Sequence, residues 1–268
     1  MPRPQLALDA RSPSIIVPIT ARDPAELDEQ LGALTGAAPS SGPARVDPSA
    51  AFDVVEWRVD LYEPFTAGAG ATAGADPAPA VAALRHIADR LPRTPVLVTF
   101  RTTAEGGSAE IAPAAYVALI EALATTGLAA ALDVEYRHPR AADAIAAAHG
   151  HDTPVVASNH DFEATPPAEE IVARLEAMER AGADVAKIAV MPRSATDVLT
   201  LLDATARRHQ VAGIPLITMS MGGLGAITRI GGGTFGSAAP FATVGPASAP
   251  GQLPAAGVRS ALAMLGAS

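Results

Sequence analysis

The chain has 268 residues, of which 49% are apolar, and it carries a formal net charge of −9 and no cysteine. Its length suits two small domains or one large α/β barrel. The negative charge argues against nucleic acid or an anionic membrane as the main partner. The lack of cysteine excludes disulfides, thiolate zinc sites and a cysteine nucleophile. No signal peptide or bilayer-spanning run is recognisable, so we expect a cytoplasmic protein.

Short β-branched runs alternate with longer helical patterns along the chain. Strands are predicted at residues 14–19, 53–59, 95–101, 130–135, 154–159, 184–190, 215–220 and 241–244. Helices are predicted near residues 24–36, 77–91, 113–126, 140–149, 167–181, 195–209 and 253–265. For the helix near 167–181, Thr165 is expected to be the N-cap, Pro166 to lie in the first turn and Gly182 to end the helix. Strands alternating with helices predict an α/β fold, a single (β/α)8 TIM barrel spanning residues 1–268.

Three segments depart from this alternation. Residues 1–13 form an N-terminal extension, and residues 66–79 are rich in Ala and Gly, as expected of a solvated loop. Residues 230–258 contain no charged side chain and are dense in Gly, Pro, Ser and Ala. A long uncharged segment before the last helix is typical of an active-site lid, which we place at 230–252, although a disordered connector would have the same composition.

Lys187 is the only lysine, and it lies within the apolar run 183–190. A buried lysine can lose its proton and act as a nucleophilic amine, which arginine cannot do. A GC-rich genome that removes lysine codons would also leave a single lysine at an arbitrary position. Composition alone does not distinguish these two explanations.

Ionisable residues gather where the predicted strands end. The C-terminal ends of barrel strands are where such folds hold their chemistry. Six consecutive strands, from the second to the seventh, contribute the following side chains: Glu56, Arg58, Arg101, Glu105, Asp133, Glu135, His160, Lys187 and Arg229. Buried charges need compensation, so a purely structural ring of ion pairs among Glu56, Arg58, Arg101, Glu105 and Glu135 is the alternative to an active site.

His160 and Lys187 carry the sharper hypothesis, because they lie on adjacent predicted strands. Apolar neighbours and nearby arginines disfavour the charged form of the lysine. A neutral amine beside a histidine suits Schiff-base chemistry, in which the amine attacks a ketone and the histidine moves protons. No two histidines have the helical spacing of metal ligands, so we predict no metal site.

Seven short motifs, in order, give the chain its resemblance to type I 3-dehydroquinate dehydratases, shikimate-pathway enzymes that use a lysine Schiff base. They are Glu56-Trp-Arg-Val-Asp60, Phe100-Arg-Thr-Thr-Ala-Glu-Gly-Gly107, Ser158-Asn-His-Asp-Phe162 with Thr165-Pro166, Lys187-Ile-Ala-Val-Met-Pro192, Met219-Ser-Met-Gly222, Phe235-Gly-Ser237 and Ser248-Ala-Pro-Gly-Gln252. The resemblance covers nearly the whole chain.

The resemblance implies dehydration of 3-dehydroquinate to 3-dehydroshikimate, a step of aromatic amino-acid biosynthesis. Lys187 would form an imine with the C3 ketone, His160 would transfer protons, and Glu105 would hold His160. The implied substrate-binding residues are Glu56, Trp57, Arg58, Arg101, Arg229, Ser248 and Gln252. The resemblance also implies a cytoplasmic homodimer without a metal or other cofactor.

The sequence departs from the family pattern at a few positions. Pro18 stands where some members have serine, Thr228 precedes Arg229 in place of serine, and Pro240 replaces a common threonine. These changes bear on the lid and the substrate contacts more than on the chemistry. A class I aldolase, or a catalytically inactive barrel that serves as a binding module, remains the alternative function.

Overall fold

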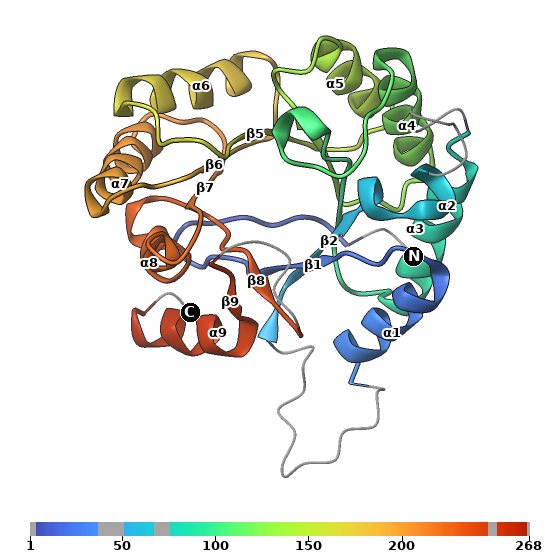
Figure 1. Ribbon diagram of the computed structural model, residues 1–268, viewed down its shortest axis with the longest axis horizontal. Helices are drawn as coiled ribbons and strands as arrows, with labels where there is room; N and C mark the ends of the chain where they lie inside the picture. The colour runs from blue at the N-terminus through green and yellow to red at the C-terminus, as the bar shows by residue number, and fades with distance from the viewer. Residues whose placement is uncertain (1–3, 37–50, 67–75, 246–250, 267–268) are drawn as a thin grey trace. The chain divides into compact units, whose positions relative to one another are not determined.

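The computed structural model describes residues 4–36, 51–66, 76–245 and 251–266 (Figure 1). It divides into two compact units. The first unit comprises residues 1–6 and 18–155, and the second comprises residues 7–17 and 156–268. The single-domain organisation expected from the sequence stays a prediction.

Seven strands keep their chain order along one sheet, from β1 to β7. Their bounds are β1 Ile16–Ile19, β2 Val54–Arg58, β3 Val96–Thr99, β4 Ala131–Glu135, β5 Val155–Asp161, β6 Val185–Val190 and β7 Leu216–Ser220. All seven were expected from the sequence, to within two residues at each end, and the alternation with helices confirms the α/β class.

The helices between and after these strands also follow the predicted pattern. The α-helices are α1 Pro24–Leu34, α2 Glu63–Thr66, α3 Ala78–Arg90, α4 Pro113–Thr125, α5 Ala141–His149, α6 Ala168–Arg180, α7 Ala195–His209, α8 Ala226–Gly231 and α9 Ala255–Met264. The short 3-10 helices are Val59–Leu61, Thr103–Glu105 and Gly232–Phe235. The short helices α2 and α8 were not expected, because neither is long enough to show a helical hydrophobic period.

In the first unit, β2, β3 and β4 are parallel neighbours, with Glu56 opposite Leu97 and Thr99 opposite Asp133. Nearly every residue of these strands is buried, as expected when both faces of a parallel sheet are covered. Aromatic packing continues beyond β3, where the Phe100 ring lies edge-on to the rings of Phe65 and Tyr116. The polar residues at the ends of these three strands therefore lie next to closely packed apolar side chains.

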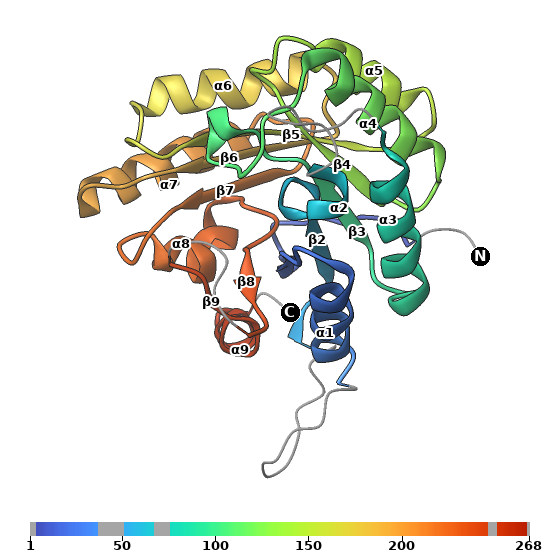
Figure 2. The same cartoon turned by 45° about the vertical axis from the view of Figure 1, so that its right-hand side comes forward.

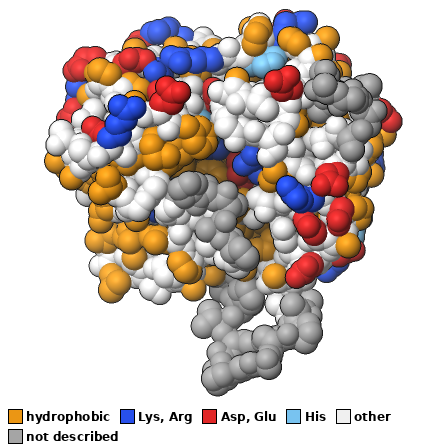
Figure 3. Space-filling model, viewed as in Figure 1, with side chains coloured by type: hydrophobic (Ala, Val, Ile, Leu, Met, Phe, Trp, Pro, Cys, Tyr) orange, Lys and Arg blue, Asp and Glu red, His pale blue; other side chains and the backbone are white. Residues whose placement is uncertain are grey.

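In the second unit, β5, β6 and β7 are parallel neighbours, and α6 and α7 pack against β6, β7 and each other (Figure 2). The helix α7 begins with a complete capping box, in which Ser194 and Asp197 bond each other's backbone N–H groups. Over α6 and α7, basic and acidic side chains are interleaved on the surface (Figure 3), and Arg207 pairs there with Glu169 at 3.0 Å. These two helices thus present a solvated, charge-balanced outer face.

The eighth predicted strand, 241–244, is only partly formed. The strand β8, Ala242–Thr243, pairs in parallel with β9, Leu253–Pro254, in a separate two-stranded sheet. The preceding segment, 237–241, bridges to β7 through Leu216 and to β1 through Ile16. Ser14 and Ile16 donate backbone hydrogen bonds to the carbonyls of Ala238 and Pro240, both at 3.0 Å. Residues 237–241 therefore lie between the starts of β1 and β7 without forming a regular strand.

The predicted N-cap of α6 was wrong by two residues. The helix begins at Ala168 with Pro167 at the N-cap position, whereas the Thr165 hydroxyl donates to the Met191 carbonyl at 3.2 Å. Thr165 thus ties the β5–α6 connection to the end of β6 instead of capping a helix. The end of α6 was predicted correctly, because Gly182 adopts a φ of 90° and closes the last turn.

Two predicted features lie partly outside the described residues. The Ala/Gly-rich loop, 66–79, includes residues 67–75, which are not described, and the predicted lid includes residues 246–250, which are not described. The described part of the lid segment up to Thr243 is largely buried. The lid therefore stays a prediction.

Candidate active site

Lys187 lies in the middle of β6 and is only 3% exposed. Its Nζ is 4.6 Å from the centre of the Phe241 ring. In the register with β5, Lys187 is opposite Ser158 and Ala189 is opposite His160. Because side chains alternate along a strand, Lys187 and Ala189 share a face, and His160 therefore projects from the same face of the sheet as Lys187. Along the strand direction the two positions are offset by two residues. The sequence predicted that the two residues lie on adjacent strands, and the pairing of β5 with β6 confirms this.

The neighbouring strand and helix add a cation on the same face. Met219 of β7 is opposite Ala189, so it shares the face of Lys187. Arg229 of α8 is 2% exposed, and its Nη1 lies 3.0 Å from the Phe241 carbonyl and 3.8 Å from the Met219 sulfur. Lys187 and Arg229 are therefore both in contact with Phe241. Burial lowers the pKa of Arg229 to about 10, so it remains a cation at neutral pH.

His160 is partly exposed at the end of β5, where the Phe162 ring stacks at 6.4 Å between centroids. The second unit thus holds a buried amine, an imidazole that solvent can reach and a buried guanidinium around one end of β5, β6 and β7. This set can perform nucleophilic attack on a carbonyl, proton transfer, and recognition of an anionic group.

In the first unit, Arg101 is the centre of a buried ion-pair network. Its guanidinium lies 2.8 Å from Asp133, 3.1 Å from Glu135 and 3.6 Å from Glu105. Burial by itself would lower the pKa of Arg101, but Asp133, Glu135 and Glu105 together raise it above its ordinary value. The structure thus contains the ion pairs of Arg101 with Glu105 and Glu135 that the sequence analysis considered, and it adds Asp133 as a third partner. The sequence had named Asp133 at the end of its strand but had not assigned it a role.

Arg58 has a partner that the sequence reading missed. The Arg58 guanidinium makes two hydrogen bonds of 2.7 Å to Asp60, which in turn accepts the backbone N–H groups of Arg101 and Ser108. Burial opposes the charge on Arg58, yet Asp60 keeps the pKa of Arg58 above its ordinary value. Spacing was the available signal, because Asp60 follows Arg58 by two residues at the end of β2. The pair fixes the direction of the Arg58 side chain.

Carboxylates of the first unit are held as firmly as its arginines. Glu56 accepts a hydrogen bond of 2.9 Å from the Thr99 hydroxyl. Glu135 accepts the backbone N–H of Thr102 at 2.8 Å and its hydroxyl at 2.7 Å. These bonds set the side chains before any substrate arrives, which is the preorganisation that binding sites need.

The structure does not support every predicted binding residue equally. Trp57 is fully buried and packs edge-on against Tyr62, and its place on the strand face opposite Glu56 favours a packing role. Gln252 is half-buried and follows Gly251, whose backbone lies directly against that of Gly222. Ser248 lies outside the described residues. A contact between Glu105 and His160 stays a prediction.

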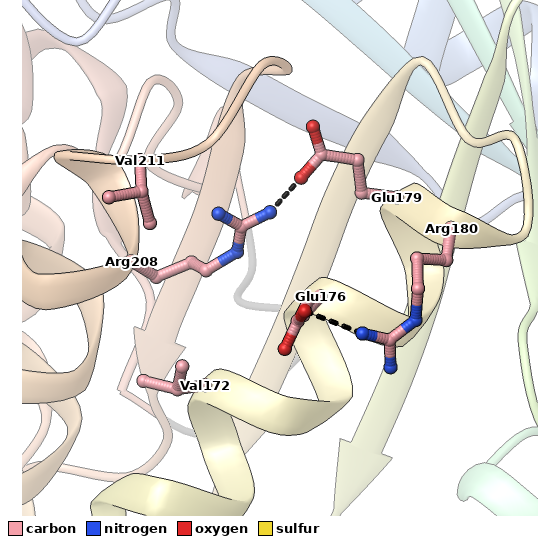
Figure 4. A pocket seen from close by; sticks show the side chains of 6 residues that line it. All are labelled: Val172, Glu176, Glu179, Arg180, Arg208 and Val211. Carbon is pink, nitrogen blue, oxygen red and sulfur yellow. Dashed lines mark ion pairs between the residues drawn. The ribbon is translucent and has the colours of Figure 1, made fainter.

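A groove between α6 and α7, of about 560 Å³, lies away from this chemistry (Figure 4). Its charged side chains are already matched, since Arg208 pairs with Glu179 and Arg180 pairs with Glu176. Within the described ranges, no three His, Cys, Asp or Glu side chains are placed to hold a metal ion. None of the helices described is both long and apolar enough to cross a membrane.

Comparisons with known proteins place this chain in one family. Residues 15–268 match the family model described as type I 3-dehydroquinase. A 3-dehydroquinate dehydratase of Listeria welshimeri is 45% identical over 256 residues, covering 95% of this chain and 93% of the relative. One from Escherichia coli is 40% identical over 263 residues, covering 97% and 96%.

Solved structures agree with the sequence relatives. A type I 3-dehydroquinate dehydratase from Clostridium difficile, solved with covalently modified comenic acid, matches with a TM-score of 0.82 and 35% identity over 96% of this chain and 93% of that one. The 3-dehydroquinate dehydratase of Geobacillus kaustophilus matches with a TM-score of 0.83 and 35% identity, covering 95% and 91%.

Proposed function

This chain belongs to the type I 3-dehydroquinase family and is thus a hydro-lyase acting on 3-dehydroquinate, and we propose that it works through a Schiff base on Lys187. The observation that carries the proposal is the position of Lys187 and His160 on one face of β5 and β6, with Arg229 nearby. The covalently modified comenic acid in the Clostridium difficile relative is consistent with covalent chemistry in the family.

The reaction begins with attack of the neutral Lys187 amine on the C3 ketone of 3-dehydroquinate. Loss of one water gives an imine, and protonation of its nitrogen makes it an electron sink for the adjacent C2–H bond. The buried apolar neighbours of Lys187 on β6 keep its amine away from bulk water. Arginine at this position could not form the imine, which explains the retention of one lysine.

His160 completes the elimination as a general base and acid. It removes the C2 proton, and the resulting enamine expels the C1 hydroxyl, which leaves as water after accepting a proton from His160. Hydrolysis of the imine by another water then releases 3-dehydroshikimate and regenerates the amine. The net change is the loss of one water. The proposal gives Glu105 the task of orienting His160.

Substrate recognition is assigned to the arginines and their acidic partners. Arg229 pairs with the substrate carboxylate, for which a guanidinium offers two parallel hydrogen bonds. Glu56, Arg58 and Arg101 are proposed to contact ring hydroxyls, with further contacts from Ser248 and Gln252. Trp57 is retained only as a support for its neighbours on β2.

The proposal extends to the setting of the reaction. We place it in the shikimate pathway, in the cytoplasm, with the chain acting as a homodimer without a cofactor. We also propose that residues 237–244 complete an eight-stranded (β/α)8 barrel. The bridges of 237–241 to Leu216 and Ile16, and the TM-scores against the two solved relatives, support this closure.

The decisive experiment combines an assay with covalent trapping. Purified protein is supplied with 3-dehydroquinate, the absorbance of the conjugated product is followed, and a parallel sample is reduced with borohydride and mapped by mass spectrometry. We expect turnover and an adduct at Lys187, and K187M should abolish both while remaining folded. Carbon–carbon cleavage of a ketose phosphate without dehydration would support an aldolase instead. If the protein shows no turnover and forms no adduct, a binding module is the function that remains.

A further inference from the structure

Arg174 of α6 contacts both neighbours of His160 in the chain. The Arg174 side chain is largely buried, and its Nη1 donates to Asn159 Oδ1 at 2.9 Å. The same nitrogen lies 3.5 Å from Asp161 Oδ2. A single guanidinium thus contacts the residues immediately before and after the histidine, from the side of the strand that α6 covers.

The rest of the guanidinium is anchored on its own helix. The Arg174 Nε donates to Glu170 Oε1 at 3.0 Å, and Nη2 contacts the same oxygen. Glu170 is half-exposed, so the charge of Arg174 is shared between a surface carboxylate and the strand end. This i,i+4 pair holds the guanidinium plane in place while Nη1 reaches β5.

The end of β5 needs such an anchor, because the chain turns sharply after it. Asp161 Oδ1 accepts the N–H groups of Glu163 and Ala164 at 3.2 and 3.0 Å, and the Asp161 carbonyl accepts Met191 N–H at 2.9 Å. Asp161 therefore joins the strand end, the following turn and the end of β6. Arg174 adds the contact from α6 to this junction.

We propose that Arg174 is a positioning residue that sets the direction of the His160 imidazole relative to Lys187. Side chains alternate along β5, so Asn159 and Asp161 point away from the face that carries His160. Fixing both of them fixes the backbone twist at His160 and hence the direction of its side chain. This inference rests on the proposed function, in which His160 transfers the C2 proton.

The position of His160 matters because the rate of proton transfer depends steeply on the distance and angle between the proton donor and acceptor. A displacement of about 1 Å at a reacting group can lower a rate about 100-fold. Loss of the Asn159 and Asp161 contacts would let the strand end twist while leaving the hydrophobic face of α6 packed through Ile171, Leu175 and Met178. We therefore expect a folded protein with a misplaced base.

The test compares R174Q with R180Q, a matched control on the same helix. Arg180 also makes an i,i+4 pair, with Glu176, but on the exposed surface. R174Q is expected to lower kcat about 10- to 100-fold with KM changed less than threefold, and R180Q to leave both unchanged. The primary isotope effect for substrate deuterated at C2 should rise in R174Q, since proton transfer becomes slower than the other steps.

A double-mutant comparison separates positioning from a general structural role. If Arg174 acts through His160, R174Q should change the residual rate less than twofold in an H160Q background. An equal loss with and without His160, or a loss of kcat with an unchanged isotope effect, would overturn the inference. If R174Q does not fold, Asn159→Ala removes the shortest strand contact and should raise the isotope effect in the same way.

The proposed function can fail separately. Wild-type protein that neither dehydrates the substrate nor traps it at Lys187 refutes the function, and the inference with it. Wild-type protein that does both, beside an R174Q variant with normal kcat, refutes the positioning role alone.

Discussion

Arg229 is a buried cation, and its burial indicates a specific role for its charge. Its guanidinium is 2% exposed, contacts the Phe241 carbonyl and the Met219 sulfur, and has a pKa lowered by burial to about 10. Removing a cation from water is costly, and proteins accept that cost where the charge performs a task. A guanidinium can make two parallel charge-assisted hydrogen bonds to a carboxylate, so Arg229 is suited to the role of carboxylate binder that we propose for it.

R229K is expected to raise KM about 30- to 150-fold, because one charge-assisted interaction is worth about 2–3 kcal/mol and the ammonium cannot make two parallel hydrogen bonds. The change in kcat should be smaller. Steady-state kinetics with R207Q as the control measure this effect, since Arg207 is an exposed arginine of α7 paired with Glu169. A normal KM in R229K would place the carboxylate elsewhere.

Residue by residue, the sequence identified charges better than it identified partners. Lys187 was found because it is the only lysine and lies in an apolar run, and His160 because it ends the predicted strand next to that of Lys187. Arg229 was found as a charge that follows the seventh predicted strand. The shared face of Lys187 and His160 follows from the register of β5 with β6 and from the alternation of side chains along a strand. Asp133, the carboxylate nearest to the Arg101 guanidinium, lies 32 residues further on in the next strand, and only the register of β3 with β4 makes the two residues neighbours. Long-range pairing of this kind leaves no local signal.

At the scale of elements, local signals decided which boundaries were predictable. Both ends of α7 were predicted, because Ser194 and Asp197 form a capping box and basic residues occupy the last turn. The start of α6 was misplaced, because a tertiary contact with Met191 captures the Thr165 hydroxyl. The segment 237–241, which precedes β8, lacks β-branched residues and forms single bridges to β1 and β7. The local pattern therefore predicted only a short strand at 241–244 and could not show that β8 pairs with β9.

The contact between the β7–α8 connection and the start of β9 yields a prediction at this scale. Gly251 has a φ of 76°, and a Cβ added there would lie 2.1 Å from the Gly222 carbonyl oxygen. G251A must therefore push residues 251–254 away from Gly222, displacing Gln252. We expect a loss of about 1–3 kcal/mol in the free energy of unfolding and a raised KM, measured by denaturant unfolding and kinetics.

Gly257 in α9 is the matched control for this change. It is exposed, and a Cβ added there meets nothing within 4 Å. Alanine at this helical position should stabilise the protein by about 0.5–1 kcal/mol with no effect on KM. Equal stability of G251A and G257A would show that the contact with Gly222 yields easily.

For the whole molecule, ionisable groups whose pKa changes on folding make stability depend on pH. His138 is such a group, because its pKa is lowered in the folded protein. Its ring lies 4.1 Å from the Tyr116 ring, and its Nδ1 accepts the backbone N–H of Arg140 at 3.2 Å. Burial lowers the pKa of His138, Glu135 opposes that change, and Arg140 adds to it. The folded state therefore holds the imidazole neutral at a pH where the unfolded chain would protonate it.

The sign of the effect on stability follows from proton linkage. Below a pH of about 6.5, the unfolded chain binds a proton at His138 that the folded protein binds less readily, so the free energy of unfolding falls as the pH falls. Above about pH 7.5 the residue is neutral in both states and the dependence ends. Carboxylates titrate mostly below this range, and comparison of the wild type with H138N between pH 5.5 and 7.5 separates His138 from the other histidines. H138N should show a shallower slope than the wild type across that interval, with parallel curves above it. Identical slopes would mean that His138 titrates alike in both states, and that its contacts with Tyr116 and Arg140 do not favour the neutral ring.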